Sequence, residues 1–577
     1  MKGLTFSEEE WTVLRREMDL DIEFDTFMVS SSQKDTLTVW MPDKRKIREP
    51  RKPCALPLAP ITNARLDFAK IRKLAVPPDG ELEELYELVE GTRLVELIRE
   101  YNLTHPPPPE NRSVSHHLLR DLPGLLEQQV FVRGRFVRDV TLWVPLFKVP
   151  KAGNEDARLI GDCRPVNERL PKPPPMKLEP LHTILRRLLR RRYLFQTDAQ
   201  SYFYQFVLGE PASSVFGVRV GGPRGIFETA RWGVMPMGWS FAPAIAQRTS
   251  NLLCENTCVL CPSVDAMPWV DNFLFGADSL EDLQAGIDTF HRISSEVGLA
   301  LKKEDPPARH LQALGLYLNV ESDRVEEHYV ELVAEKKEAM RSALMQLRRE
   351  PTARSLFRVF GNLMWGFYAV THVPLSRYPV VMAEVRKTAS QVMQATKDAW
   401  DKPIQLSYAL DRELESMVDL VHRARLTLED LEAPALNQDA WSDASGRIRG
   451  WGHVWEDVRG IQAAAELHDI PDIFVAELLA AANTWYTSAV EGFTPLLYVD
   501  NSGAAAALVK GHSRNAAGDL ILRRLHESLP EGSKASVAWL PTDCQRADNP
   551  SRGIRSIPER CHCTHPARPV AWTVRSC

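Results

Sequence analysis

No stretch of the 577-residue sequence approaches the roughly 20 consecutive apolar residues that a membrane-spanning helix needs. The most apolar candidate helix, residues 359–370, is interrupted by Asn362 and is too short, so we expect a buried helix there. The first residues, 1–11, lack the apolar core of a secretory signal. We therefore expect a soluble intracellular protein of the cytoplasm or nucleus, neither secreted nor attached to a membrane.

An excess of positive charge is also missing, because 71 Lys and Arg residues face 76 Asp and Glu residues. The overall charge therefore gives no indication of nucleic-acid binding, and basic residues have to be considered locally. They are most concentrated in residues 186–192, where Leu185, Leu188 and Leu189 are spaced to face a core from one side of a helix. Two interpretations stay open: a solvated helix face, or a surface that contacts phosphates.

Cysteine is sparse, and the nine residues are an odd number scattered along the chain, which predicts reduced thiols. Cysteines gather at residues 254–261 and 561–565, but neither group has the second pair that a structural zinc site requires. The sequence contains no Gly-Lys-[Ser/Thr] phosphate loop and no recognisable integrase or protease motif. Integration into DNA would therefore need another protein.

The length and the changes of periodicity along the chain predict several domains with α+β and α/β architecture. Strands alternate with helices in the second segment, helices dominate the third, and strands return in the fourth. The predicted segments are an N-terminal region of unknown role (1–125), a strand and helix domain (126–320), a helical segment (321–436), a compact mixed domain (437–553) and a C-terminal tail (554–577).

An acidic hairpin is predicted at residues 267–275, where two apolar runs flank Asp271 and Asn272. Both of these residue types tolerate the positive φ of a tight turn. Another carboxylate, Asp198, ends a predicted strand. Carboxylate oxygens are the ligands that Mg²⁺ prefers. In isolation an ordinary surface hairpin is the simpler explanation, so the functional interpretation depends on the surrounding chain.

Four acids are distributed over separate elements of the mixed domain. Asp443 lies in a predicted strand, Glu477 on a helix, Asp500 at the end of an apolar strand, and Asp548 before a helix or turn. Any one of them could be a solvent-facing carboxylate. Bringing all four together is unfavourable unless cations neutralise them, so the set predicts a two-metal phosphodiester hydrolase.

Ordered motifs along the chain carry a family resemblance. They are Lys151, Arg158, Arg164, Asn167, residues 196–205, residues 233–244 with Gln247, the hairpin at Asp271, residues 298–303 and residues 314–315. In this order they resemble a retroelement reverse transcriptase from the fingers through the palm. Residues 437–553 resemble a retroelement RNase H, including the Ala-Asp-x-x-Ser-Arg ending at residues 547–552. The pairing of the two is similar to the tyrosine-recombinase retrotransposons, the DIRS and VIPER-like elements.

The resemblance implies a right-hand polymerase with fingers, palm and a helical thumb or connection, followed by an RNase H-like mixed-sheet domain. It implies that Lys151 and Arg158 contact the triphosphate and that Gln247 shapes the template and nucleotide pocket. Phe203 is either the steric gate against a ribose 2′-hydroxyl or a core aromatic. The implied metal ligands, which would hold two Mg²⁺ (or Mn²⁺) in each active site, are Asp198, Asp271, Asp443, Glu477, Asp500 and Asp548.

The chain departs from the family pattern most clearly at Asn272, where the resemblance implies a second catalytic Asp. An amide oxygen can bind Mg²⁺, but the change removes one negative charge from a site for two dications. Smaller departures are Trp269 for Tyr or Phe, Gln545 for Asn, and an early position of Lys302 and Lys303.

The resemblance therefore implies an RNA-directed DNA polymerase with RNase H activity that acts on an RNA template, a DNA primer, an RNA–DNA hybrid and dNTPs. One alternative is a polymerase-impaired remnant in which the palm only holds a duplex while the RNase H cuts. The other is a nucleic-acid-binding protein with both sites silent. The sequence predicts no particular oligomeric state.

Overall fold

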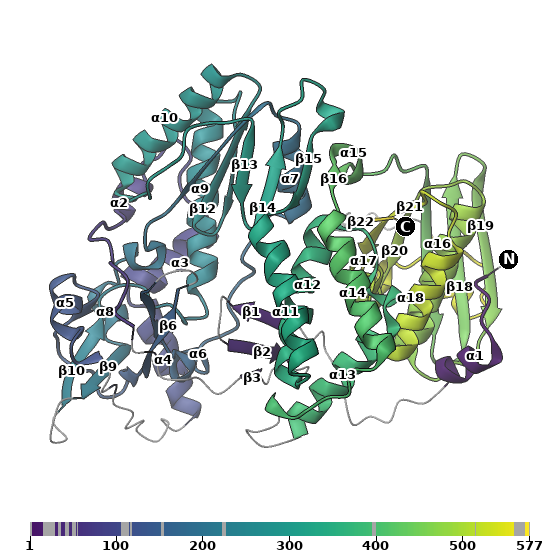
Figure 1. Cartoon of the computed structure of the whole chain (residues 1–577), viewed down its shortest axis with the longest axis horizontal. Coiled ribbons are helices and arrows are strands. Elements are labelled where there is room, and N and C mark those ends of the chain that lie inside the picture. Colours follow the sequence, from purple (N-terminus) through teal and green to yellow (C-terminus); the bar gives the residue numbers. More distant parts are fainter. Residues whose placement is uncertain are drawn as a thin grey trace.

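The computed structural model describes residues 3–15, 29–32, 36–40, 46–48, 54, 56–105, 115, 118–151, 155–221, 227–394, 400–513, 515–558 and 572–575. In Figure 1 most of the N-terminal half of the chain lies on the left, a group of helices in the middle and a large C-terminal sheet on the right, where the N-terminus also lies. The predicted hairpin at residues 152–154 and the cysteines at 561–565 lie outside the described residues.

Within the described residues, no helix combines the length and the apolar character needed to cross a membrane.

The first hydrophobic core contains buried residues between Leu66 and Leu299. It surrounds a four-stranded sheet with the order β4-β10-β9-β5 and a hairpin of β6 and β7. The strands are β4 (Phe131–Val132), β5 (Leu142–Trp143), β6 (Leu146–Pro150), β7 (Ala157–Gly161), β9 (Phe216–Gly221) and β10 (Phe227–Trp232). The helices are α2 (Phe68–Ile71), α3 (Gly80–Glu90), α4 (Arg93–Thr104), α5 (Leu122–Glu127), α6 (Arg164–Asn167) and α8 (Glu210–Ser213).

A three-stranded antiparallel sheet separates the first core from the second. Its order is β11 (Asp265–Trp269), β12 (Asn272–Ala277) and β8 (Tyr193–Asp198). Side chains alternate between the two faces of a strand. In β12, Phe273 and Phe275 accordingly face the first core, with α9 (Ala242–Leu260) and α10 (Leu280–Val297), whereas Leu274 faces the second core, with α7 (Leu181–Leu189).

The second core joins α7 to a four-stranded sheet and to the predicted helical segment. The sheet order is β13 (His310–Ala313), β14 (Leu316–Asn319), β15 (Tyr329–Leu332) and β16 (Leu426–Thr427). The helices are α11 (Ala334–Arg349), α12 (Ala353–Val370), α13 (Pro379–Gln394), α14 (Tyr408–Arg423) and α15 (Leu428–Leu431). The buried helix expected at residues 359–370 is confirmed as the second half of α12, and Leu185, Leu188 and Leu189 face this core as predicted.

The third core lies under a six-stranded mixed sheet with the order β19-β18-β17-β20-β21-β22. Strands β17, β18 and β19 are antiparallel, whereas β20 and β21 run parallel to β17. These strands are β17 (Gln438–Ser445), β18 (Gly450–Asp457), β19 (Gly460–Leu467), β20 (Pro495–Val499), β21 (Lys534–Trp539) and β22 (Trp572–Arg575). Helices α16 (Ile473–Val490), α17 (Ser502–Lys510) and α18 (Ala516–Ser528) supply this core, and the short α19 (Asp548–Ser551) lies against β17 and β18.

The predicted multidomain α+β and α/β fold class is confirmed.

The N-terminal 125 residues contribute to different parts of the molecule. Helix α1 (Glu8–Arg15) packs on the third core, where Leu14 is fully buried, and the backbone N–H of Leu4 donates to Asn483 Oδ1 on α16 at 2.8 Å. Glu10 forms an ion pair with Arg524 on α18. Strands β1 (Val29–Ser32), β2 (Thr36–Trp40) and β3 (Lys46–Arg48) form a small sheet beside α12, and residues from Leu66 onward enter the first core.

We expect Leu14→Ala to lower the free energy of unfolding of the C-terminal domain by about 2–5 kcal/mol, the usual cost of removing a fully buried leucine side chain. Chemical denaturation of the full chain measures this change. The control is Glu9→Ala on the exposed face of α1, which should change the unfolding free energy by less than about 0.5 kcal/mol. Equal effects of the two substitutions would show that α1 is not docked on α16 and α18.

Candidate active sites

Two carboxylates meet at one end of the three-stranded sheet. Strand β8 ends at Asp198, and in the neighbouring strand Asn272 lies directly opposite Asp198. Asp271 comes immediately before β12, and its carbonyl oxygen accepts a hydrogen bond of 2.7 Å from the N–H of Ala199. The structure therefore brings Asp198, Asp271 and Asn272 together, as expected.

The turn between β11 and β12 differs from the sequence expectation by one residue. Trp269 pairs with Asn272, so the turn residues are Val270 and Asp271, and Asn272 belongs to the strand. Val270 has φ +56°, a conformation that is rare for a β-branched residue. Its N–H donates to Gln247 Oε1 at 2.7 Å, and its carbonyl accepts from Ser250 Oγ at 2.6 Å. The prediction that Asp271 and Asn272 form the turn is wrong, because the hydrogen bonds between α9 and Val270 outweigh the local preference of Asp and Asn for turns.

Gln247 is fully buried in α9 beneath this turn. Besides accepting from Val270, its amide donates to Asn251 Oδ1 at 2.8 Å and to the carbonyl of Pro268 at 3.3 Å. The side chain therefore holds the acidic hairpin in place, and its predicted role at a template or nucleotide would act through the shape of that hairpin. The sequence placed Gln247 near the site but missed this contact.

The other predicted nucleotide contacts lie on two neighbouring elements. Lys151 follows β6, with its Nζ 3.9 Å from Asp156 Oδ2, and Arg158 is exposed in the facing strand β7. Phe203 lies in the 3₁₀ helix Tyr202–Gln205, half-buried against the first core. This position is compatible with both a core aromatic and a steric gate.

Protein groups partly neutralise Asp198 and Asp271. Burial raises the pKa of Asp271, and the nearby Asp198 raises it further, whereas the charges of Lys302 and Arg158 lower it. Lys302 Nζ lies 2.6 Å from Asp198 Oδ1, and Asn272 Nδ2 donates to Asp271 Oδ1 at 3.2 Å. Each of the two carboxylates is thus already in contact with a donor from the chain itself.

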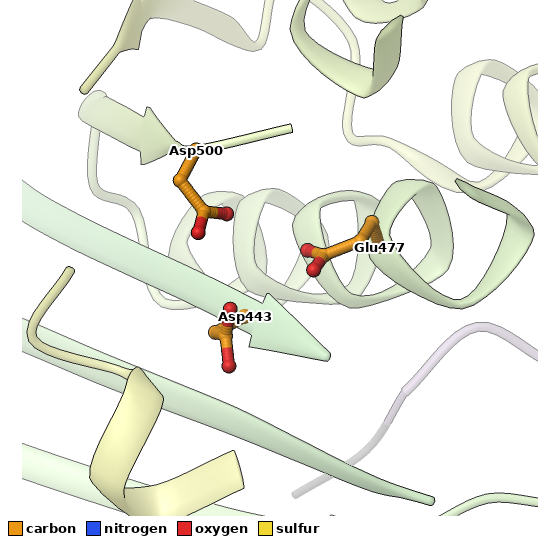
Figure 2. A group of neighbouring side chains, drawn as sticks. All are labelled: Asp443, Glu477 and Asp500. Atoms are coloured by element: carbon orange, nitrogen blue, oxygen red, sulfur yellow. The ribbon is translucent and has the colours of Figure 1, made fainter. Parts of the chain in front are cut away.

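Three acids converge in the C-terminal domain, as Figure 2 shows. One oxygen from each of Asp443, Glu477 and Asp500 lies within 4.8 Å of the others. Asp443 lies in β17, Glu477 in the second turn of α16, and Asp500 directly after β20. Within the described part of the chain this is the one group of three or more metal-type ligands, so the cysteines at 254–261 form no such group.

The three acids are poorly compensated by the protein. Burial and the neighbouring carboxylates raise the pKa of Glu477 to about 9 and that of Asp443 to about 6. Burial also raises the pKa of Asp500. Two buried oxygens, Glu477 Oε2 and Asp500 Oδ1, have no hydrogen-bond partner among the described residues. Mutually repelling carboxylates with unsatisfied oxygens fit a divalent cation, which supplies the missing positive charge.

Asp548, the fourth predicted acid, begins α19 and lies outside the group of three. Its Oδ1 is 2.7 Å from Arg552 Nη2. The hydroxyl of Ser551 donates to Asp443 Oδ2, and Gln545 Nε2 donates to the carbonyl of Ser442 at 2.8 Å. The spacing of four residues on one helical turn could have predicted the pair of Asp548 and Arg552. Ser551 and Gln545 contact residues that are far away in the sequence, so no local sequence pattern predicts these contacts.

The arginines of the arginine-rich helix form ion pairs with acids of the same chain. Arg187 and Arg191 each lie 2.7 Å from a different carboxylate oxygen of Asp265 in β11. Arg191 also lies 2.7 Å from Asp278, and Arg190 lies 2.9 Å from Glu432. These pairs fasten α7 to the acidic hairpin and to α15, which favours a structural role over phosphate contact for these three arginines.

Comparisons with known proteins give a partial sequence match and several structural similarities. No family model matches the chain. A segment of 271 residues is 23% identical to the Gag-Pol polyprotein of bovine immunodeficiency virus (strain R29), covering 44% of this chain and 16% of that polyprotein. The chain therefore spans about a sixth of the curated relative that it matches.

Among solved structures, the chain is similar to the foamy viral protease-reverse transcriptase. In the complex with an RNA/DNA hybrid the identity is 14% and the TM-score 0.44, over 95% of this chain and 76% of that one. In a complex of the dRH form with double-stranded DNA the identity is 16% and the TM-score 0.44, over 88% and 90%. These similarities do not single out the tyrosine-recombinase subtype.

The raised pKa values predict how stability depends on pH without metal. A carboxyl whose pKa is higher in the folded state binds its proton more tightly there, so its protonation stabilises the fold below that pKa. We expect the melting temperature of the C-terminal domain in EDTA to fall as the pH rises from about 4.5 towards 9, the range set by Glu477.

The Glu477→Gln variant should lose most of this decline, because a neutral amide replaces the titrating group. Differential scanning calorimetry across this pH range measures both proteins. A melting temperature that rises with pH in the wild type but not in the variant would contradict the assignment of a buried, protonated Glu477.

Proposed function

We propose that the chain is an RNA-directed DNA polymerase and RNase H of a retroelement, and that its C-terminal domain degrades the RNA strand of an RNA–DNA hybrid. The convergence of Asp443, Glu477 and Asp500 within 4.8 Å carries this proposal. Three carboxylates from a strand, a helix and a strand end are unfavourable together unless they hold cations that act on phosphodiesters.

The residues that would hold two Mg²⁺ or Mn²⁺ ions in this domain are Asp443, Glu477, Asp500 and Asp548. Such ions, when bound, activate a water molecule and stabilise the charge on the leaving oxygen. The protein fixes the ligands: Gln545 ties the segment before Asp548 to the backbone of β17, and the indole N–H of Trp539 donates to the carbonyl of Asp500 at 2.7 Å. A preorganised set of ligands needs little rearrangement during the reaction.

For the polymerase palm, Asp198 and Asp271 would hold the ions, and an RNA template, a DNA primer and dNTPs would be the substrates. A second candidate function is a palm that binds a duplex without extending it. Two observations favour it: Asn272 is neutral, and Lys302 already neutralises Asp198. Both candidates place the protein inside the cell.

The narrower proposal is that the retroelement belongs to the tyrosine-recombinase class, the DIRS and VIPER-like elements. It rests on the pairing of these polymerase motifs with this RNase H ending, without an integrase motif in the chain. Sequencing the genomic copies tests it: a tyrosine-recombinase reading frame beside the coding sequence is expected, and an integrase frame in its place would exclude this class.

Cleavage of an RNA–DNA hybrid by the full chain in Mg²⁺ tests the nuclease proposal. Asp443→Asn and Glu477→Gln should each reduce cleavage by at least about 100-fold, because each removes a charged ligand at nearly constant volume. Circular dichroism checks that both variants fold. The control is Glu491→Gln, an exposed acid just after α16, which should cleave normally. Undiminished cleavage by both site variants would reject the assignment.

Primer extension on an RNA template tests the palm. Wild-type extension should be weak, and Asn272→Asp should raise it by about 10-fold, a change that needs only about 1.4 kcal/mol of transition-state stabilisation. Asp271→Asn in the same background should remove the gain. Strong extension by the wild type would show that the amide suffices. No gain from Asn272→Asp would favour the palm that only binds a duplex.

A further inference from the structure

Strand β19 forms one edge of the six-stranded sheet, at the right-hand margin of the molecule in Figure 1. Its inner edge pairs with β18 in an unbroken antiparallel register, and its outer edge has no strand partner among the described residues. Every residue of the strand except Ala464 is exposed. Alternate residues of an edge strand point their N–H and C=O groups away from the sheet, so β19 presents unpaired backbone donors and acceptors.

Other edges of the described sheets have features that prevent pairing with a further strand. Strands β4, β5 and β16 are only two residues long, and β11 contains Pro268, which cannot donate a backbone hydrogen bond. Strand β19 has eight residues, no proline, no lysine or arginine, and no bulge in its register with β18. Its one charged side chain is that of Glu466. Proteins seldom leave such a long, regular edge unprotected, which indicates that β19 pairs with a partner strand.

The side chains of β19 divide into an apolar face and a polar face. Successive residues of a strand point to opposite faces. Ala464 packs against the third core, and Gln462 and Glu466 lie on the same face as Ala464. Ile461 and Leu467 lie on the other face, where they are 50% and 80% exposed. A matching partner strand therefore needs apolar side chains on one face and a hydrogen-bond donor for Glu466 on the other.

We propose that β19 pairs antiparallel with β19 of a second copy of this chain, about a two-fold axis that passes through Ala464 perpendicular to the sheet. Residues directly opposite each other in an antiparallel pair lie on the same face of the sheet, so such an axis has to pass through a residue of the strand. With the axis at Ala464, Ile461 of each copy lies opposite Leu467 of the other, and Gln462 lies opposite Glu466.

The strand is self-complementary in this register. Two contacts between isoleucine and leucine cover apolar groups that are exposed in the single chain, and the amide of Gln462 donates to the carboxylate of Glu466 in the other copy. An axis one residue away in either direction places Glu466 opposite Gly460 or Ala464 and separates the large apolar side chains. Pairing over residues 461–467 makes a small interface, so we expect a reversible dimer with a dissociation constant on the order of 10 µM. This association goes beyond the proposed catalytic activities and does not depend on them.

Sedimentation equilibrium of the full chain without nucleic acid, from about 1 to about 100 µM, tests the dimer. We expect the wild type to change from one copy to two over this range. Ile461→Lys combined with Leu467→Lys places like charges opposite each other and should weaken association at least about 10-fold. Ile461→Lys combined with Leu467→Glu places opposite charges there and should associate at least about 10-fold more tightly than the double-lysine variant. Within one chain the two positions are about 20 Å apart, so this difference reports contact between copies.

The matched control is Leu103→Lys combined with Val259→Lys, which adds two lysines at exposed apolar positions of α4 and α9 and should associate like the wild type. Circular dichroism checks that all variants fold. A wild type that stays a single copy at about 100 µM would overturn the proposal in favour of a strand from another protein. Undiminished association of the double-lysine variant, equal dissociation constants for the two charge combinations, or weakened association of the control would each overturn it as well.

Discussion

Repulsion between carboxylates held close together is the physical constraint on which both halves of this molecule depend. A buried acid loses the hydration that stabilises its charge, and a second acid nearby raises the cost of ionisation further. Acids lie close together at two places in the chain, at the start of β12 and where β17, α16 and β20 meet. The surrounding elements serve to hold the acids in place: Gln247 and Ser250 fix the strained turn at Val270, and Asp472 caps the start of α16 by accepting from the N–H of Val475.

The two sites resolve the repulsion in different ways. At the ends of β8 and β12, Asn272 stands where the resemblance implies an acid, and Lys302 Nζ lies 2.6 Å from Asp198 Oδ1, so much of the charge is balanced within the protein. In the C-terminal domain the triad keeps its charge or its protons, with the pKa of Glu477 raised to about 9. The triad therefore has less compensation from the protein than the pair of Asp198 and Asp271 has.

The sequence predicted the features that depend on local pattern. Alternating and helical periodicity placed Asp198 at a strand end, Glu477 on a helix and Asp500 after an apolar strand, because each of these positions is set within a few neighbouring residues. The sequence failed to predict features that are determined by residues far along the chain. The turn shifted by one residue because α9 supplies the partners of Val270, and the arginines of α7 were ambiguous because their partners, Asp265 and Glu432, lie far along the chain. Ser551 and Lys302 were missed as contacts of the acids for the same reason.

The position of α1 connects the two ends of the described chain and adds a constraint on the acidic triad of the C-terminal domain. Leu14 and the pair of Glu10 and Arg524 fasten α1 to the outer side of α16 and α18, and α16 is the helix that carries Glu477. On the inner side, the side chain of Asp519 on α18 contacts Arg386 on α13, so α18 is also held to the helical segment. The helix that presents the most strongly perturbed acid therefore packs between β17 and α18, and α18 is in turn held by elements from two remote parts of the sequence. A rigid support of this kind keeps the three carboxylates at a fixed separation, which is what a site built on their repulsion requires.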